Sequence, residues 1–209
     1  MEGLFQKSLN EVIDLAASDA PAPGGGSVSA MVACFGLAMT AMVGNLTVGK
    51  KNYRDVEPQA REIVLEVNDS LKRLEELAER DTRVFNQFID SFRLPQKTPE
   101  EISAREGAIQ KTLCEATETP LAIAREGVKA LELTLIMARI GNKTAISDVG
   151  VAALALDAAI NGALLNVEVN ISRLKDREYI EKVVQESKCL SAAASRLKDE
   201  SVQAARARF

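Results

Sequence analysis

Apolar residues recur along most of this chain at the three- and four-residue spacing of an α-helix, and not at the alternating spacing of a strand. The longest stripe advances by steps of four and three from Val67 to Phe92. No segment combines alternation with enrichment in β-branched and aromatic residues. The pattern therefore predicts an all-α protein with no sheet.

Capping residues, glycines and prolines divide this pattern into about seven predicted helices. Thr98-Pro99-Glu100-Glu101 has the form of a capping box, and Thr119-Pro120 repeats its Thr-Pro start. Ser147 and Asp176 are the expected N-caps of the last two helices. Short connections favour an up-and-down bundle. The expected helices cover residues 4–17, 27–48, 58–94, 99–118, 120–140, 148–174 and the segment after 176.

The composition points to one domain. The 209 residues are 46% hydrophobic, which is enough for one substantial core, and no linker rich in Pro, Gly or Ser divides them. Residues 1–209 are therefore expected to form a single helical domain. Aromatic residues make up only 4% of the chain, so the core must consist mainly of Ala, Leu, Val and Ile.

The charge pattern and the residue content exclude several kinds of function. The net charge is −4, and the charged residues are interspersed without the basic stripe of a nucleic-acid-binding protein. The absence of histidine excludes a His-based triad, a His general base and His-ligated zinc. Acid–base chemistry must therefore use Asp, Glu, Lys, Tyr or solvent. Cys34, Cys114 and Cys189 lie far apart and are expected to be reduced, as in a cytoplasmic protein.

Two apolar regions raise the question of a membrane span, for which about 20 apolar residues suffice. Residues 20–48 contain a Pro-Ala-Pro-Gly-Gly-Gly run and several hydroxyl side chains, and residues 149–171 include Asp157 and Glu168. Charged groups are costly at a bilayer centre, so we expect no membrane span. The first residues lack the layout of a signal peptide, and we expect a cytoplasmic location.

One carboxylate interrupts the longest apolar stripe. A buried, ionised Asp is costly unless it is paired or hydrogen-bonded, and such a group is a candidate for function. Asp81 is therefore a candidate catalytic residue. Alternatively, it lies at the edge of the stripe and pairs with an arginine such as Arg80 or Arg83, or with a partner helix. The stripe consists of Val67, Leu71, Leu74, Ala78, Asp81, Phe85, Phe88 and Phe92.

A glycine-rich loop precedes the second predicted helix, for which Ser27 or Ser29 is the expected N-cap. Gly24, Gly25 and Gly26 leave the backbone open, and the free N–H groups of a helix N-terminus can bind an anion or a carboxylate. The loop is thus a candidate binding site. The alternative is a tight turn that lets two helices pack.

Other polar residues lie at predicted helix ends or within apolar helices. Lys50 and Lys51 follow the second helix and can either capture an anionic substrate or complement the helix dipole. Asn142 and Asp148 bracket a short loop, where they are candidate ligands of a substrate or ordinary capping residues. Asn166 lies in an Ala-rich helix, where it can line a polar pocket or bond to neighbouring backbone.

Taken together, these motifs resemble the cyclodeaminase domain of formiminotransferase-cyclodeaminase. They are similar as well to its stand-alone relatives, the bacterial cyclodeaminases and methenyltetrahydrofolate cyclohydrolases. The resemblance covers nearly the whole chain in order. It rests on residues 22–30, 42–47, 49–53, 81–85, 93–101, 141–143, 147–148 and 166–170.

This resemblance implies an all-helical, dimeric enzyme that acts on tetrahydrofolate derivatives. The family's catalytic aspartate lies in an Asp-x-x-x-Phe element, which here runs from Asp81 to Phe85. The glycine loop with Ser27 and the polar residues at helix ends are then the expected substrate-binding groups. Asn52 departs from the third lysine of many relatives, which leaves the role of the basic loop open. We expect no formiminotransferase domain within these 209 residues.

Two reactions fit the residues that are available. In cyclodeamination, N10 of 5-formiminotetrahydrofolate attacks the formimino carbon, and ammonia leaves to give 5,10-methenyltetrahydrofolate. In the hydrolase variant, water opens the methenyl bridge to give the 10-formyl compound. Both need proton transfer at a nitrogen, for which Asp81 is the expected acid and base, and neither needs a metal or a redox cofactor.

Two alternatives from other classes of function stay open. A non-catalytic helical module would bind folate without turnover, and a structural interaction protein would not bind folate at all. The surfaces of the helices predicted at 27–48 and 148–174 are rich in Ala and Gly, which favours close packing. Together with the resemblance, they lead us to expect a homodimer.

Overall fold

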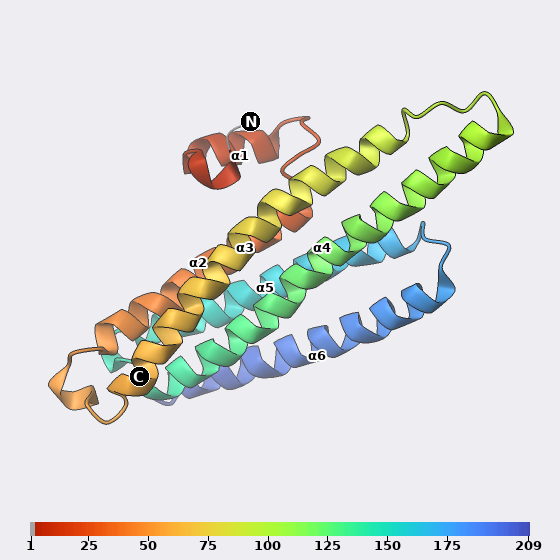
Figure 1. The fold of residues 1–209 in the computed structure, drawn as a ribbon. Helices are drawn as coiled ribbons and strands as arrows, with labels where there is room; N and C mark the ends of the chain where they lie inside the picture. Colours follow the sequence, from red (N-terminus) through yellow and green to blue (C-terminus); the bar gives the residue numbers. More distant parts are fainter. Residues whose placement is uncertain (1–2) are drawn as a thin grey trace.

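The computed structural model describes residues 3–209, which contain no strand and are almost entirely helical (Figure 1). The all-α prediction is confirmed. The α-helices of this region are α1 (Leu9–Ala17), α2 (Gly25–Thr47), α3 (Glu57–Ser91), α4 (Pro99–Ile140), α5 (Ile146–Ile171) and α6 (Arg177–Arg206). Three short 3-10 helices accompany them: η1 (Leu4–Gln6), η2 (Lys51–Tyr53) and η3 (Lys143–Ala145).

The five long helices form the bundle, and α1 lies to one side of it (Figure 1). Helix α2 packs against α3, α4 and α5, while α5 packs against α2, α4 and α6. Helices α2 and α5 are antiparallel, since Gly25 approaches Asn166 at one end and Gly36 approaches Leu156 further along. Gly25 and Gly36 of α2 therefore let α5 approach closely.

The predicted count of seven helices is wrong, because the segments expected at 99–118 and 120–140 form one helix, α4. Pro120 has no backbone N–H, so it cannot bond to the carbonyl of Ala116. The side-chain amide of Asn170 on α5 donates to that carbonyl instead, at 2.8 Å. A neighbouring helix thus satisfies the group that proline leaves unpaired, and α4 continues through Pro120.

Three other predicted boundaries also need correction. The helix expected at 4–17 is divided, because Ser8 caps α1 in a capping box with Glu11 and separates it from η1. Helix α2 begins at Gly25 with Gly24 as its N-cap, so neither Ser27 nor Ser29 caps it. Helix α5 begins at Ile146 directly after η3, so Ser147 lies inside the helix.

The N-caps predicted at Thr98 and Asp176 are confirmed. The Thr98 side chain accepts a hydrogen bond from the Glu101 amide within a full capping box, and Asp176 accepts one from the Tyr179 amide. Capping groups of this kind stabilise a helix by about 1 kcal/mol each. They fix the starts of α4 and α6, which pack against each other.

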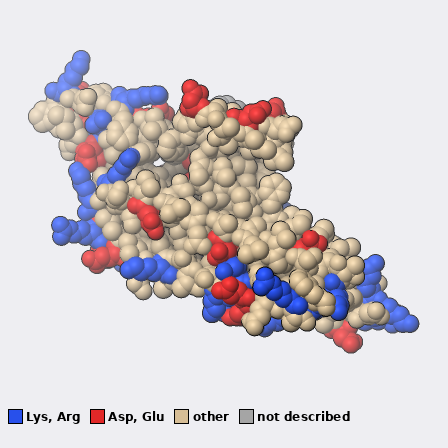
Figure 2. Space-filling model, turned by 180° about the vertical axis from the view of Figure 1, so that it is seen from behind, with Lys and Arg blue, Asp and Glu red and all other residues tan. Residues whose placement is uncertain are grey.

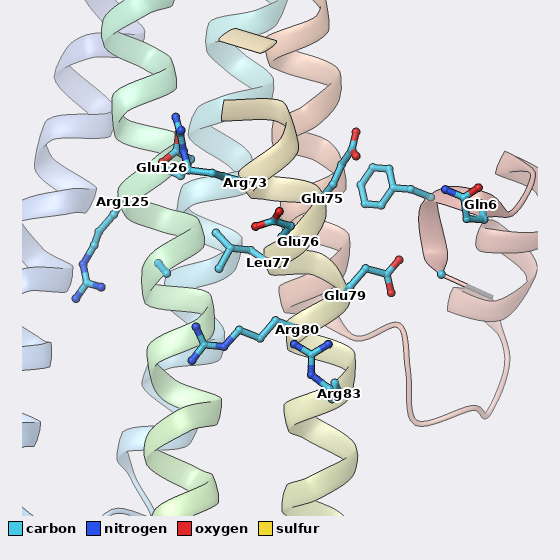
Figure 3. A pocket seen from close by; sticks show the side chains of 13 residues that line it. Gln6, Arg73, Glu75, Glu76, Leu77, Glu79, Arg80, Arg83, Arg125 and Glu126 are labelled. Atoms are coloured by element: carbon cyan, nitrogen blue, oxygen red, sulfur yellow. The ribbon is translucent and has the colours of Figure 1, made fainter. Parts of the chain in front are cut away.

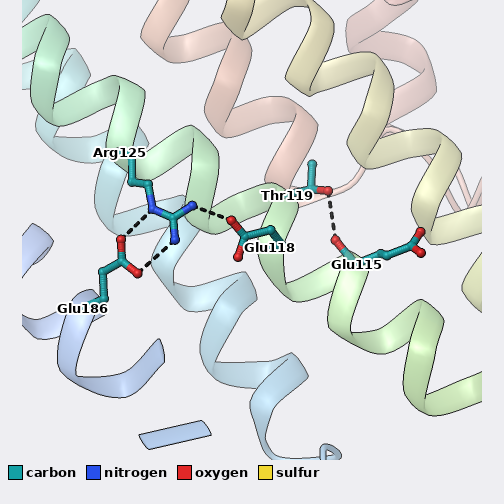
Figure 4. A network of polar contacts seen from close by, with 5 residues as sticks. All are labelled: Glu115, Glu118, Thr119, Arg125 and Glu186. Carbon is teal, nitrogen blue, oxygen red and sulfur yellow. Dashed lines mark hydrogen bonds and ion pairs between the residues drawn. The ribbon is translucent and has the colours of Figure 1, made fainter. Parts of the chain in front are cut away.

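An arginine links α4 to α6 (Figure 4). Arg125 donates to both carboxylate oxygens of Glu186, at 2.5 and 2.9 Å, and also to Glu118. Hydrogen bonding to Glu186 raises the pKa of the Arg125 guanidinium and lowers the pKa of the Glu186 carboxyl. The two-pronged geometry fixes the position of α6 against α4.

Helices α2 and α5 are the apolar centre of the molecule, yet each has an exposed apolar side. Both are long and apolar enough to cross a membrane, although 61% of the most apolar part of α2 is buried within the bundle. Viewed from behind, the face opposite α3 and α4 is largely free of charged side chains across its middle (Figure 2). Its exposed residues include Val28 and Leu46 of α2 and Val151, Leu154 and Val169 of α5.

Candidate active site

A pocket of about 460 Å³ lies where the start of α2 meets α3, α4 and the end of α5. It brings together the glycine loop, Asp81 and Asn166, which are far apart in the sequence. Apolar side chains of α3, among them Phe85, Phe88 and Ile89, form part of its wall. The pocket thus combines a carboxylate, exposed backbone and a flat apolar surface.

Asp81 is held by the first turn of α2. Its Oδ2 atom accepts hydrogen bonds from the backbone amide of Ser27 at 2.8 Å and from the Ser27 hydroxyl at 2.9 Å. The amide is one of the free N–H groups of a helix N-terminus, so Asp81 caps α2 from a neighbouring helix. This arrangement explains why α2 needs no capping side chain of its own.

Opposing effects act on the Asp81 carboxyl. Burial raises its pKa above the ordinary value of an aspartate, and the two hydrogen bonds from Ser27 partly offset that rise. Asp81 forms no ion pair within residues 3–209, so the predicted alternative of pairing with Arg80 or Arg83 is not observed. A carboxyl group whose protonated and ionised forms are brought closer in energy is suited to proton transfer.

The Ser27 hydroxyl has three neighbours but only one proton. It lies 2.9 Å from Oδ2 of Asp81, 3.0 Å from the Ala78 carbonyl and 3.1 Å from the Thr82 hydroxyl. When Asp81 is ionised, the hydroxyl can donate to it. When Asp81 is protonated, the hydroxyl can donate to the Ala78 carbonyl, so that both states keep a complete set of hydrogen bonds.

Two of the three glycines are required by close contacts. A Cβ atom on Gly26 would lie 2.3 Å from Oδ1 of Asp81, and one on Gly25 would lie 2.8 Å from the Asn166 amide nitrogen. A Cβ on Gly24 would meet nothing within 4 Å. Gly25 and Gly26 therefore let α2 pack directly on the polar side chains of the pocket.

Asn166 and Asn170 lie one turn apart on α5, and both line the pocket. The Asn166 amide donates to the Gly162 carbonyl at 2.9 Å, so it bonds to neighbouring backbone while it also lines the pocket. Asn170 connects the pocket to Pro120 through the carbonyl of Ala116. Pro120, Ala116 and Asn170, which together keep α4 continuous, therefore form part of the pocket wall.

Four of the predicted binding residues lie elsewhere. Lys50, Lys51, Asn142 and Asp148 are near the other end of α2 and the start of α5. Asn142 links these ends, since its side chain donates to the Leu46 carbonyl at 2.8 Å and accepts from the Thr144 amide at 3.0 Å. Within one chain, the basic loop and Asp81 do not form a single site.

The pocket also contains residues that sequence reasoning missed. Arg173, Ala116, Pro120 and Thr82 line it, and among the described lining residues Arg173 is the one basic side chain. Arg173 follows the end of α5 without any motif, so only the antiparallel packing of α5 on α2 reveals its place. Over residues 3–209, no three Asp, Glu or Cys side chains gather in a geometry that suits a metal ion.

A larger cavity of about 980 Å³ lies between the α3–α4 side of the bundle and η1 (Figure 3). Both basic and acidic side chains line it, and Arg73 forms an ion pair with Glu126 at 2.9 Å. It contains neither the glycine loop nor Asp81. The smaller pocket, where these two features meet, is therefore the candidate active site.

Comparison with known proteins agrees with this geometry. The family model described as formiminotransferase-cyclodeaminase matches residues 8–188. The chain belongs to this family. The match includes the glycine loop, Asp81 and Asn166, so the residues that form the pocket all lie in the part shared with the family.

The relatives of this family member fall into two kinds. The chain is 39% identical to a methenyltetrahydrofolate cyclohydrolase of Methylorubrum extorquens, over 92% of this chain and 93% of that protein. It is 31% identical to the formimidoyltransferase-cyclodeaminase of Rattus norvegicus, over 91% of this chain but only 37% of that larger protein. A crystal structure of formiminotetrahydrofolate cyclodeaminase from Thermotoga maritima matches 98% of both chains, with a TM-score of 0.89 and 26% identity.

Proposed function

We propose that this family member is an enzyme that converts one-carbon derivatives of tetrahydrofolate at the Asp81 pocket. It acts as a methenyltetrahydrofolate cyclohydrolase, a formiminotetrahydrofolate cyclodeaminase, or both. The observation that carries the proposal is a half-buried carboxyl group with a raised pKa, which lines the pocket and is held there by the N-terminus of α2. The names of the relatives supply the substrate class.

Oδ1 of Asp81 is the proposed proton-transfer atom. Oδ2 accepts both hydrogen bonds from Ser27, whereas Oδ1 lies beside Gly26 and accepts neither. In cyclodeamination, N10 forms a bond to the carbon of the protonated formimino group as Asp81 takes the N10 proton, and the carbon–nitrogen double bond of that group becomes a single bond to NH2. Asp81 then returns that proton to the departing nitrogen, and the bond between carbon and ammonia breaks. A positioned carboxylate contributes about 10²–10⁴-fold to such steps.

The hydrolase reaction uses the same group on a different nucleophile. Water forms a bond to the methenyl carbon while Asp81 accepts one of its protons. The bond from that carbon to N5 then breaks as Asp81 protonates N5, and the remaining hydroxyl proton passes to solvent as the formyl C=O bond forms, which gives the 10-formyl compound. Both reactions therefore need one carboxyl group that gains and loses a proton, and neither step requires a metal or a redox cofactor.

The remaining pocket residues would bind the substrate. Phe85, Phe88 and Ile89 offer an apolar wall for a flat pterin ring, and the amides of the glycine loop and Asn166 offer polar contacts to its edge. Arg173 supplies one cation for a carboxylate of the substrate. These assignments follow from position and chemistry.

The protein is proposed to act as a homodimer through the apolar face of α2 and α5. This face carries exposed large side chains, including Val28, Leu46 and Val169, over two helices that are already close-packed. Exposed apolar patches of this kind mark an interface or a membrane contact. A second copy would cover the face and keep the enzyme in the cytoplasm, without a membrane or nucleic-acid partner.

The proposal is tested by giving the purified protein 5-formiminotetrahydrofolate and 5,10-methenyltetrahydrofolate separately. Absorbance of the methenyl species rises in cyclodeamination and falls in hydrolysis beyond the uncatalysed rate. Turnover of either compound supports an enzyme, and the direction identifies the reaction. Binding without turnover would instead establish a non-catalytic folate-binding module. Absence of binding would favour a structural interaction protein and refute the proposal.

A further inference from the structure

The Asp81 pocket is short of positive charge for the substrate class proposed above. Arg173 is its one basic lining residue in the described chain, whereas folate derivatives carry carboxylates. Lys50 and Lys51 are exposed and form no ion pair within residues 3–209. They follow the far end of α2, whose 23 residues span about 34 Å. Within one chain, these lysines cannot reach the pocket.

The outer side of α2 has a pattern that suits pairing with itself. Six apolar residues follow one another at steps of four, three, four, three and four, and all of them are exposed or half-buried. Such spacing places them on one stripe of the helix, as in the seam of a coiled coil. No charged residue interrupts α2. The stripe consists of Val28, Val32, Phe35, Met39, Met42 and Leu46.

The register of an antiparallel pair follows from this stripe. A two-fold axis at its middle, near residue 37, places Val28 opposite Leu46 of the partner subunit. The same register places Gly24 opposite the partner subunit's Lys50, because both pairs of residue numbers have the same sum. The glycine loop of one chain then adjoins the basic loop of the other.

We infer that the active site is completed across the dimer, with Lys50 and Lys51 of the partner subunit beside the glycine loop and Asp81. The inference rests on the proposed function, because it names the groups that would hold the anionic part of the substrate. It also reconciles the two halves of the sequence motif, which lie at opposite ends of α2 within a single chain. Each dimer would contain two such shared sites.

The test combines two variants with different defects. One chain carries Asp81→Asn, and the other carries Lys50→Ala together with Lys51→Ala. The lysines are exposed, so their loss leaves the fold intact. Each variant alone is expected to lose activity, through turnover in the first and through KM in the second. Co-expression with two different tags and tandem purification then yields mixed dimers.

In a mixed dimer, one shared site has an intact aspartate and intact lysines, while the other site has neither. Activity of about half the wild-type value per dimer is therefore expected. If each lysine pair serves its own chain, neither site is intact and the mixed dimer stays inactive. That result, or a lysine variant with wild-type KM, overturns the inference. Wild-type turnover in the same assay shows that the proposed function itself is sound.

A cross-link provides a readout that does not depend on activity. Gly24→Cys is tolerated sterically, since a Cβ at Gly24 meets nothing within 4 Å. Chains with Gly24→Cys and chains with Lys50→Cys, both in a Cys189→Ser background, are mixed and oxidised. A disulfide-linked heterodimer is expected only when both variants are present. No cross-link in a sample that is dimeric by sedimentation overturns the antiparallel register.

Discussion

Gly26 and Asp81 are so close that a Cβ atom on Gly26 would lie 2.3 Å from Oδ1 and 2.6 Å from Oδ2 of Asp81. Such a distance is shorter than any ordinary contact, so Gly26→Ala must displace the carboxyl group. We expect turnover to fall by at least about 10²-fold, because small misplacement of a reacting group is costly. Steady-state kinetics check this prediction.

Gly24→Ala is the matched control for that experiment. It adds the same methyl group two residues earlier in the same loop, where nothing lies within 4 Å. It is expected to keep turnover within a few-fold of wild type. Equal losses in Gly24→Ala and Gly26→Ala would mean that loop flexibility, and not the contact with Asp81, limits the reaction.

Ser27→Ala should change the pH dependence of the reaction. The Ser27 hydroxyl lowers the pKa of Asp81, so its removal should raise that pKa further. Because the ionised form of Asp81 acts as the base, the acid limb of kcat/KM is expected to move to higher pH. Ser29→Ala is the control, since the Ser29 hydroxyl bonds to the Gly25 carbonyl and not to Asp81. If the acid limb of Ser27→Ala does not move, the ionisation of Asp81 does not set that limb.

The link between Asn170 and Pro120 predicts that the effects of substituting these two residues on the free energy of unfolding are coupled. Asn170→Ala leaves the Ala116 carbonyl without a donor and should lower the free energy of unfolding by about 1 kcal/mol. Pro120→Ala restores a backbone N–H that can bond to the same carbonyl. The double variant should therefore be more stable than Asn170→Ala alone. Denaturant unfolding of the three variants measures this coupling, and strict additivity would refute it.

A charge in the apolar stripe of α2 should dissociate the proposed dimer. Met39 is half-buried in the single chain, and Met39→Glu would place two carboxylates near the two-fold axis of the proposed interface. Leu65→Glu is the control, because Leu65 is exposed on α3, outside that face. Sedimentation is expected to show monomers for Met39→Glu and dimers for Leu65→Glu. A wild-type protein that is monomeric at micromolar concentration would contradict the interface.

Much of the fold was predictable because it depends on local rules. Helical spacing identifies the long helices, and the caps at Thr98 and Asp176 depend only on neighbouring residues. The prediction failed at Pro120, where a side chain 50 residues later in the sequence supplies the missing hydrogen bond. Such a compensation depends on tertiary packing, so no local rule can anticipate it.

The site was predictable in part for the same reason. Asp81 is conspicuous as a carboxylate in an apolar stripe, and the glycine loop has a clear local signature. Arg173 has no such signature and joins the pocket only through the antiparallel packing of α5. The basic loop was recognised as a motif, yet its distance from Asp81 depends on the direction of α2, which sequence spacing alone does not give.

The most direct test of the account is the turnover and the melting temperature of Asp81→Asn, measured on one sample. The amide keeps the shape and can still accept the Ser27 hydrogen bond, but it cannot take a proton. Because burial raises the pKa of Asp81, ionisation of this group costs stability above that pKa, and the variant should melt no earlier than wild type at neutral pH. Turnover should fall by about 10²-fold or more. An early-melting variant whose folded fraction works at the wild-type rate would contradict the account.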